Sequence, residues 1–482
     1  MSAGMSTIAI IFRTEARRML RGRWLPALWL VFAVLCGWAA RDGAAWVAQR
    51  EAALAAILDD ERATHALRRA QIADKVTPEN RGFYGGALYA TAMSLRATLP
   101  PGELAVLTVG QAEGYPMAAT VFPFAASNTI FDKHVAGMEN PNVLAAGRFD
   151  LAFVMVWLLP LLVLAGSFDL WSSERERGMA PWLLSQPVAP LRLLLAKAAA
   201  RALLLVAPPV AILLVTLGAA MDWRGPGAAP WPALLVLGAL VLLYGLFWLA
   251  LALVVNLFAR GGAQAALGCL AGWLVLVVLL PALALALADL AAPPASQAER
   301  VNALRAQAML ARAELRAQAQ ASPVPEPDPA LAPAIPDSLR HRAAEVARGE
   351  VLIAAAQQPF RRQDARRHAW LDALRAVSPA VALQDALERL AGADAARALR
   401  FQDQAHGFLL EVRVLVGRYL DQDRLLGVAD YDRGLPRFTF REASAPERAA
   451  SLLFDGAVIA AALAALLAVA GVLARRRLLL ID

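Results

Sequence analysis

Apolar runs long enough to cross a bilayer constrain this chain more than any other feature of its sequence. A transmembrane helix needs about 20 mostly apolar residues, and six runs meet or approach this length: 24–45, 149–170, 198–220, 232–258, 263–290 and 452–474. Hydrophobic residues fill 59% of the 482 positions and charged residues only 18%, whereas soluble domains are about a quarter charged. The sequence therefore predicts an all-α polytopic membrane protein with six transmembrane helices.

Basic residues gather in the short flanks of these runs and set the predicted orientation. The clusters are Arg13, Arg17, Arg18, Arg21 and Arg23 before the first run, Arg175, Arg177, Arg192, Lys197 and Arg201 between the second and third, Arg260 between the fourth and fifth, and Arg475, Arg476 and Arg477 after the sixth. If successive flanks alternate sides, all four clusters lie on one side. Because cytoplasmic flanks carry the excess of Lys and Arg, we expect both termini, including the tail 475–482, in the cytoplasm of a bacterial inner membrane.

The net charge of +7 follows from the same flanks. Basic flanks face anionic lipid, so nucleic acid is not an expected partner. Residues 1–23 also carry apolar side chains at helical spacing, with arginines on much of the remaining surface. This pattern predicts an amphipathic helix in the headgroup plane. A cleaved signal peptide is the alternative, but the long basic leader and Trp24, Trp29 and Trp38 in the first run favour a retained span.

Two long segments, 46–148 and 291–451, then lie outside the cytoplasm. Their charges do not contradict this placement, because long segments cross a membrane largely regardless of charge. Both segments open with helical patterns, so we expect the two insertions to be mostly helical. Within the second, prolines at every second position from Pro323 to Pro329 interrupt the pattern. They predict an extended polyproline connector over 322–337, with a disordered loop as the alternative.

Four consecutive charges, Glu174-Arg175-Glu176-Arg177, lie within the predicted cytoplasmic loop 171–197 and form what we call the charge cluster. Glutamates beside an anionic leaflet are unfavourable unless basic groups pair with them. Arg175 and Arg177 can pair with them locally, which would make the cluster a charge-balanced helix end. Alternatively, the glutamates receive basic groups from a cytoplasmic partner. The residues alone leave both interpretations open.

The layout resembles the permease subunits of ABC transporters of the ABC-2 exporter type. The matching features are the leader helix, the six spans, a Glu-Arg-Glu-x-Gly motif at 174–178, the stretch Leu183-Leu184-Ser185-Gln186-Pro187-Val188, and Lys197 at the start of the third span. GRFDLAFV (147–154), SPAVALQDAL (378–387) and YDRGLPRF (431–438) are similar to a subgroup whose large outer domain has no assigned function. The chain departs from the family pattern at Met179-Ala180-Pro181, where Thr-Leu-Glu is common.

This resemblance implies a subunit that couples ATP hydrolysis by a separate nucleotide-binding subunit to export. The loop would dock on that subunit through Glu174, Arg175, Glu176, Arg177, Gly178, Leu183, Leu184 and Pro187. ATP and Mg²⁺ would be bound by the partner, and no cofactor by this chain. Further expected partners are a second permease copy or a paralogue, the lipid bilayer and a periplasmic component.

No phosphate-binding Gly-x-x-x-x-Gly-Lys-Ser/Thr loop, Gly-x-Ser-x-Gly or His-Glu-x-x-His motif occurs in the sequence. Cys36 and Cys269 lie inside apolar runs, and the five histidines are scattered, so no metal site or catalytic residue is expected. Polar residues in or beside the spans, namely Tyr244, Asn256 and Gln264, are candidates for a translocation path. The alternatives are a non-transporting scaffold or sensor whose outer helical domain binds a partner and, with less support, a membrane enzyme.

Overall fold

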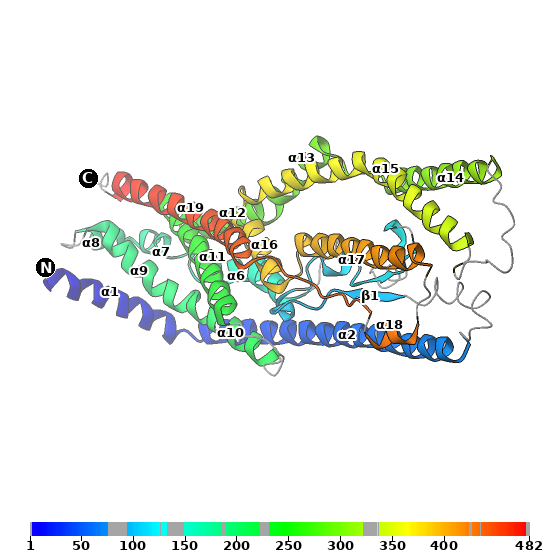
Figure 1. The fold of residues 1–482 in the computed structure, drawn as a ribbon. Coiled ribbons are helices and arrows are strands. Elements are labelled where there is room, and N and C mark those ends of the chain that lie inside the picture. The colour runs from blue at the N-terminus through cyan, green and yellow to red at the C-terminus, as the bar shows by residue number, and fades with distance from the viewer. Residues whose placement is uncertain are drawn as a thin grey trace.

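Helices dominate the computed structural model of the chain (Figure 1). It describes residues 2–75, 94–125, 127–132, 149–185, 189–221, 231–321, 335, 337–423, 427–433 and 435–478. The longer helices are α1 (Ser2–Arg21), α2 (Trp24–Lys75), α9 (Pro190–Leu205), α10 (Ala207–Ala220), α11 (Trp231–Phe258), α12 (Gly262–Trp273), α13 (Leu280–Ala291), α14 (Gln297–Ala321), α15 (Asp337–Arg375), α16 (Pro379–Ala391), α17 (Ala395–Asp421) and α19 (Ala445–Leu478). The short ones are α5 (Leu151–Phe153), α6 (Leu159–Ala165), α7 (Ser172–Glu176), α8 (Ala180–Leu184) and α18 (Val428–Asp432).

Shorter elements connect these helices. The 3₁₀ turns are η1 (Ala105–Leu107), η2 (Ala112–Gly114) and η3 (Ser127–Thr129), and the π-helical turns are η5 (Val154–Leu158) and η6 (Leu274–Leu279). Strands β1 (Leu95–Thr98) and β2 (Ala118–Val121) form an antiparallel pair in which Leu95 lies opposite Val121. The prediction of a mostly helical chain is therefore confirmed, and this strand pair is a correction to the all-α class. Four-residue strands are too short to leave a clear alternating pattern in the sequence.

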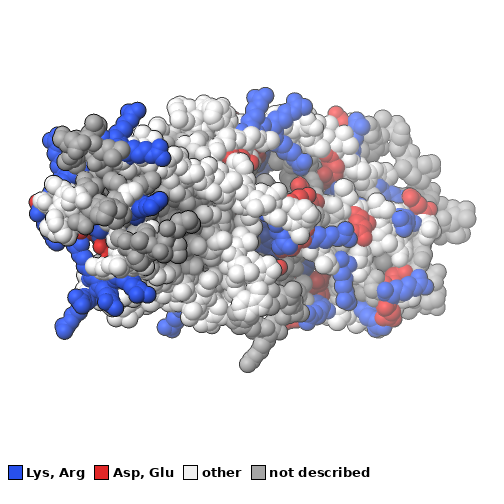
Figure 2. Space-filling view, turned by 90° about the vertical axis from the view of Figure 1, so that its left-hand side faces the viewer, with Lys and Arg blue, Asp and Glu red and all other residues white. Residues whose placement is uncertain are grey.

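The molecule is elongated, and both termini lie at one end (Figure 1). Helices α1, α8 and α9 and the C-terminal part of α19 lie at this end, whereas α14, α17, α18 and the last turns of α2 lie toward the other. Figure 2 shows Lys and Arg concentrated at one end, charges of both signs at the other, and a largely uncharged belt between them. An uncharged belt between two charged ends is the surface that a bilayer requires.

Among the described residues, five helical segments are long and apolar enough to span a membrane: Trp24–Ala73, Arg192–Ala220, Trp231–Phe258, Gly262–Ala291 and Ala445–Arg476. They overlap five of the six predicted spans. The sixth, 149–170, is helical only over Leu151–Ala165. Fifteen residues rise about 22 Å, less than the about 30 Å of a bilayer's hydrocarbon core. Five of the six predicted spans thus correspond to helices long enough to cross a membrane, and the sixth corresponds to a shorter apolar helix.

Gly166 follows the short helix and lies close to α9. A Cβ atom at this position would lie 2.4 Å from the end of the Leu205 side chain, which would have to shift for a larger residue. The chain then turns over residues 166–171 before α7 begins. The charge cluster therefore does not continue a straight helix from span 149–170. It follows residues 166–171, which we call the bent segment.

Helix α2 is continuous over 52 residues and about 78 Å, far longer than a bilayer is thick. Its outer half packs on a second core, separate from that of the spans. This core includes Ile72 of α2, Leu95 of β1, Phe124, and Phe401 and Phe408 of α17. The first predicted insertion thus begins as an extension of the first span. The predicted connector 322–337 lies outside the described residues except at its last positions.

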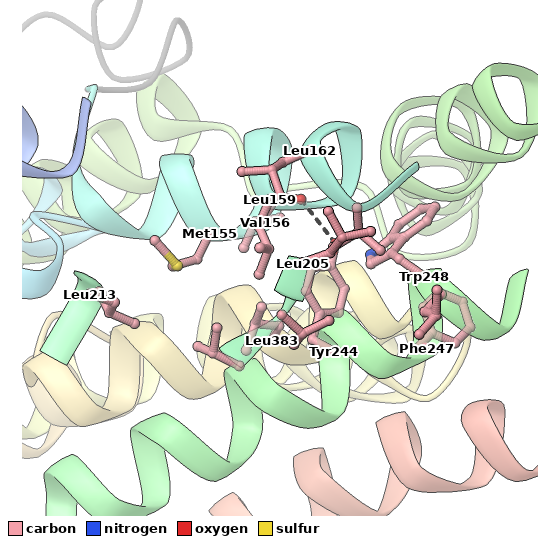
Figure 3. Packing of buried hydrophobic residues seen from close by; sticks show 14 of the residues in the cluster. Met155, Val156, Leu159, Leu162, Leu205, Leu213, Tyr244, Phe247, Trp248 and Leu383 are labelled. Carbon is pink, nitrogen blue, oxygen red and sulfur yellow. Dashed lines mark hydrogen bonds between the residues drawn. The ribbon is translucent and has the colours of Figure 1, made fainter. Parts of the chain in front are cut away.

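Helix α16 lies among the spans, although its sequence belongs to the second predicted insertion. Its Leu383 and Leu387 join the same core as Tyr244 and Leu213 of the spanning helices (Figure 3). Side chains also bond the carbonyls of the two π-helical turns: the Tyr244 hydroxyl donates to Val156 O at 2.9 Å, and the Ser378 hydroxyl donates to Leu276 O at 3.0 Å. Irregular turns at membrane depth need such partners, so α11 and the start of α16 stabilise both.

Glu350 of α15 ties the outer domain together. Its carboxylate accepts hydrogen bonds from the Ser127 backbone N–H and hydroxyl, each at 2.7 Å, and from Arg413 of α17 at 3.0 Å. Burial raises the pKa of Glu350, but the bonds from Ser127 and Arg413 outweigh it, so the pKa lies below its ordinary value. A carboxylate with a lowered folded-state pKa stabilises the fold above its unfolded pKa, and this contribution is lost as pH falls through the folded value.

We expect Glu350→Gln to lower the free energy of unfolding of the outer domain by about 1–3 kcal/mol at neutral pH. The difference from wild type should shrink at a pH low enough to protonate wild-type Glu350 as well, which lies below the ordinary pKa of a glutamate. Thermal unfolding of the detergent-solubilised protein at both pH values measures this. Asp403→Asn, at an exposed position of α17, is the control. A difference that is the same at both pH values would contradict the assignment.

Candidate functional site: the charge cluster and its supports

The charge cluster forms a tight helix end. Helix α7 ends in a Schellman motif, in which Met179 N donates to Glu174 O at 2.9 Å and Gly178 N donates to Arg175 O at 3.1 Å. Gly178 adopts φ +69°, the left-handed conformation that glycine occupies without strain. Helix α8 follows at once, with Pro181 in its first turn. The glycine of the motif is thus explained by backbone geometry.

The Glu174 side chain points inward and contacts basic residues of two other helices. Its Oε1 atom accepts hydrogen bonds from Lys197 Nζ of α9 at 2.8 Å and from Arg18 Nη1 of α1 at 3.3 Å. Its side chain is 13% exposed. Burial raises the pKa of Glu174, but the hydrogen bond from Lys197 and the positive charges of Lys197, Arg18 and Arg177 outweigh it and lower the pKa. Glu174 is therefore an anion that joins α7 to α9 and α1.

Arg175 and Glu176 hold the turn between α11 and α12. Arg175 Nη1 donates to Ala259 O, just beyond the C-terminal end of α11, at 2.6 Å. Glu176 Oε2 accepts from Gly262 N, the first residue of α12, at 2.9 Å. A cation at a helix C-terminus and an anion at a helix N-terminus are each favourable. The Arg177 backbone N donates to Ser173 O, but its side chain is exposed and makes no hydrogen bond or ion pair with the residues that the structure describes.

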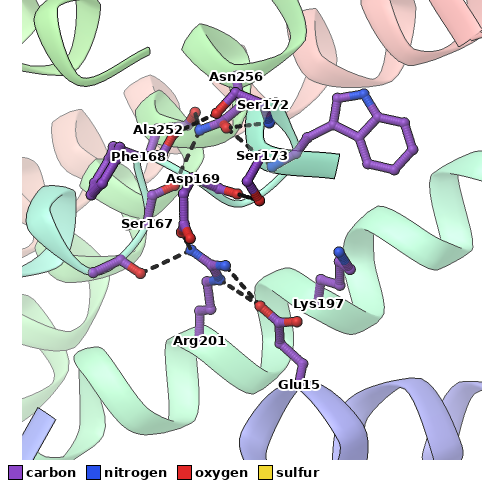
Figure 4. Close-up of polar contacts among 12 residues, drawn as sticks. Glu15, Ser167, Phe168, Asp169, Ser172, Ser173, Lys197, Arg201, Ala252 and Asn256 are labelled. Atoms are coloured by element: carbon purple, nitrogen blue, oxygen red, sulfur yellow. Dashed lines mark hydrogen bonds and ion pairs between the residues drawn. The ribbon is translucent and has the colours of Figure 1, made fainter. Parts of the chain in front are cut away.

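A second network lies beside the first (Figure 4). Arg201 of α9, 3% exposed, donates to Glu15 of α1 at 2.9 Å, to Asp169 at 2.6 Å and to Gly166 O at 2.9 Å. A buried guanidinium needs such partners, because an unpaired buried charge is very costly. The leader helix is therefore attached to α9 and to the end of the short helix.

Asn256 uses its whole amide to support the bent segment (Figure 4). Its Oδ1 atom accepts from Trp171 N at 3.1 Å and Ser172 N at 3.0 Å, and its Nδ2 atom donates to Ser167 O and Ala252 O. The side chain is fully buried. This positioning role accounts for Asn256 without contact to a substrate.

The other predicted site residues lie in varied surroundings. Tyr244 is fully buried against η5. Gln264 is exposed in the first turn of α12, where its Oε1 accepts from Arg260 N at 2.9 Å. Leu183 is half-buried. The Leu184 side chain and Pro187 lie outside the described residues. The structure thus brings Asn256 to the charge cluster but leaves Tyr244 away from it, in the membrane core.

Sequence reasoning missed the exposed apolar residues beside the cluster. Trp182 of α8 is 61% exposed, and Met179 is 44% exposed. Both lie in the short segment after Gly178, and a tryptophan in a short charged loop was the signal that could have identified them. We call Arg177, Met179 and Trp182 the coupling face. Among the described residues, no group of His, Cys, Asp or Glu could hold a metal ion.

A comparison with protein-family models matches residues 9–479 to the family described as ABC-2 family transporter protein. A comparison with curated proteins found no match. The family match spans nearly the whole chain and includes the charge cluster, both outer segments and all five long apolar helices.

We expect Glu174→Gln to destabilise the protein by about 3 kcal/mol, because it leaves the buried Lys197 without its anion. The double variant Glu174→Gln/Lys197→Met should recover most of this loss, since it removes both charges. An unfolding titration with SDS in mixed micelles measures the differences. Glu176→Gln, at an exposed carboxylate, should cost about 1 kcal/mol or less. A double variant as unstable as Glu174→Gln alone would show that the stranded Lys197 is not the cause.

Proposed function

Because this chain belongs to the ABC-2 family of transporter membrane proteins, we propose that it is the permease subunit of an ATP-driven exporter in a bacterial inner membrane. Members of the family are permeases without an ATPase domain of their own, and this sequence contains no phosphate-binding loop. A separate nucleotide-binding subunit supplies the hydrolysis of ATP and holds the ATP and Mg²⁺. The observation that carries the proposal is the exposed coupling face. It lies on a segment that hydrogen bonds and an ion pair attach to α9, α11 and α12.

The coupling face has the composition of a protein-binding surface. Trp182 and Met179 expose apolar area next to the unpaired cation of Arg177. Tryptophan and arginine are enriched among the residues that dominate binding energy. This face lies at the same end of the molecule as both termini and their basic clusters (Figure 1). The positive-inside rule places that end in the cytoplasm, where ATP is available.

The hydrogen bonds and ion pairs of Glu174, Arg175 and Glu176 link the coupling face to the spans. Glu174 transmits a displacement of α7 to α9 and α1, while Arg175 and Glu176 transmit it to the turn between α11 and α12. ATP-driven dimerisation of the nucleotide-binding subunits would move the segment and so favour one of two arrangements of the spans. Glu174 thus acts as a positioning residue, and contact with the partner falls to the coupling face.

Two of the candidate spans have apolar faces that this chain leaves largely uncovered, and a second permease copy or a paralogue could pack there. In the most apolar window of Gly262–Ala291 only 6% of the residues are buried within the chain, and in that of Ala445–Arg476 only 17%. Lipid and a second subunit together would cover these faces and complete a translocation path.

Co-purification with the nucleotide-binding subunit tests the proposal. We expect co-expressed wild-type permease to retain this ATPase in mild detergent. Arg177→Ala/Trp182→Ala should reduce the retained ATPase activity about tenfold or more, because two central contacts are lost. The matched control is Arg21→Ala/Trp24→Ala, which removes the same two residue types, both exposed, near the same end of the molecule.

Each departure from this result has a separate meaning. If wild type retains no ATPase, the permease proposal fails, and the alternative of a scaffold or sensor that binds a partner through its outer domain takes its place. If both double variants retain the ATPase, the permease proposal stands and the assignment of the coupling face is wrong.

A further inference from the structure

The half of α15 near the spans carries an exposed row of residues on one face. Arg362, Arg366 and Trp370 follow one another at four-residue intervals, which places them on the same side of the helix. All three are exposed, Trp370 by 47%. We call them the α15 row. It ends toward Val377, which is 50% exposed in the turn that leads to α16.

Three hydrogen bonds fix the depth of this row relative to the candidate span Gly262–Ala291. Beside the row, Arg367 Nη1 donates to Asp289 Oδ1 at 2.5 Å, and Gln363 Nε2 donates to Pro293 O at 2.9 Å. Both acceptors lie at the outer end of that span. Further along, the Ser378 hydroxyl donates to Leu276 O, near the middle of the span. The chain from Arg367 to Ser378 therefore descends about 16 Å along α13, beside which α15 lies in Figure 1.

The order of residues along this descent follows the polarity of a bilayer. Arg362 and Arg366 lie near the level of the span's end, Trp370 follows within the next turn, and Val377 approaches mid-span depth. Cations at the headgroups, aromatic rings at the interface and aliphatic side chains in the hydrocarbon are the distribution found in membrane proteins. A surface that faced only water would not require this gradient.

The two arginines of the row have no anionic partner among the described residues. Arg362 Nη2 donates only to the neutral Gln358 side chain at 3.1 Å, and Arg366 makes no hydrogen bond or ion pair there. The nearby carboxylates are occupied, Asp364 by Arg300 at 2.6 Å and Asp372 by Arg375 at 3.5 Å. Positive charge at the level of the headgroups is therefore left uncompensated.

We propose that the α15 row docks anionic phospholipid headgroups of the leaflet opposite the chain termini. A guanidinium binds phosphate through two parallel N–H···O bonds, and Trp370 and Val377 below the arginines contact the glycerol and acyl regions of the same lipids. The row thereby anchors the outer domain on the membrane beside α16, which packs among the spans. This inference rests on the placement of the spans in a bilayer and is independent of any ATPase partner.

The test uses the full chain in nanodiscs of phosphatidylcholine mixed with phosphatidylglycerol. Native mass spectrometry of the released protein measures bound phosphatidylglycerol. We expect Arg362→Gln/Arg366→Gln to weaken its binding on the order of tenfold, and Arg362→Lys/Arg366→Lys to keep most of it, because the charge remains. The matched control is Arg342→Gln/Arg348→Gln, at two exposed positions of the same helix on the other side of Pro359 from the row.

A nitroxide on Ala369→Cys, an exposed position beside the row, locates the surface independently of affinity. We expect it to be more accessible to oxygen, which partitions into lipid, than to a water-soluble nickel reagent. Equal phosphatidylglycerol binding by wild type and Arg362→Gln/Arg366→Gln would overturn the proposal. Predominant contact of the label with the nickel reagent would overturn it as well and would indicate a row that faces water or an acidic protein. Co-purification of the ATPase should be unchanged by these variants.

Discussion

A charge buried beside a bilayer must be paired, and the pairing of Arg201 is the constraint on which the end of this structure that carries the termini depends. Its guanidinium bonds Glu15 of α1, Asp169 and the carbonyl of Gly166 at once. Those three contacts join the leader helix, α9 and the bent end of the short helix. Without them the Gly166 carbonyl and two carboxylates would lose a partner at the point where the chain leaves the short helix Leu151–Ala165. The charge cluster therefore follows a segment whose position is fixed by contacts with α1 and α9.

The same requirement recurs wherever the backbone is irregular. Tyr244 and Ser378 bond the carbonyls of the two π-helical turns, and Asn256 bonds two N–H groups and a carbonyl of the bent segment. In water these groups would find solvent, but in a membrane side chains must replace it. Polar residues inside the spans of this chain thus serve largely to stabilise departures from regular helix.

Sequence reasoning located the spans because a bilayer imposes a length that any chain must meet locally. It could not find that the helix at 149–170 ends early, because the segment that follows it is held by contacts with other helices, as from Asn256 and Arg201. It placed α16 outside the membrane because SPAVALQDAL is an ordinary amphipathic pattern, and only the fold shows that its apolar face meets the spans. The partners of Glu174 lie 23 and 156 positions away along the chain, beyond any local pattern.

The coupling role that we propose places two demands on one short segment, and in that role they account for the dense charges of the cluster. A segment that transmits force must be stiff toward the spans, which favours short-range ion pairs and hydrogen bonds to helix ends, as Glu174, Arg175 and Glu176 provide. It must also expose groups that a partner can recognise, as Arg177, Met179 and Trp182 do. Helix α7 is a single turn and a half, so its successive residues point in different directions. Inward and outward contacts can then alternate within a few positions, and a continuous run of charges is the sequence that results.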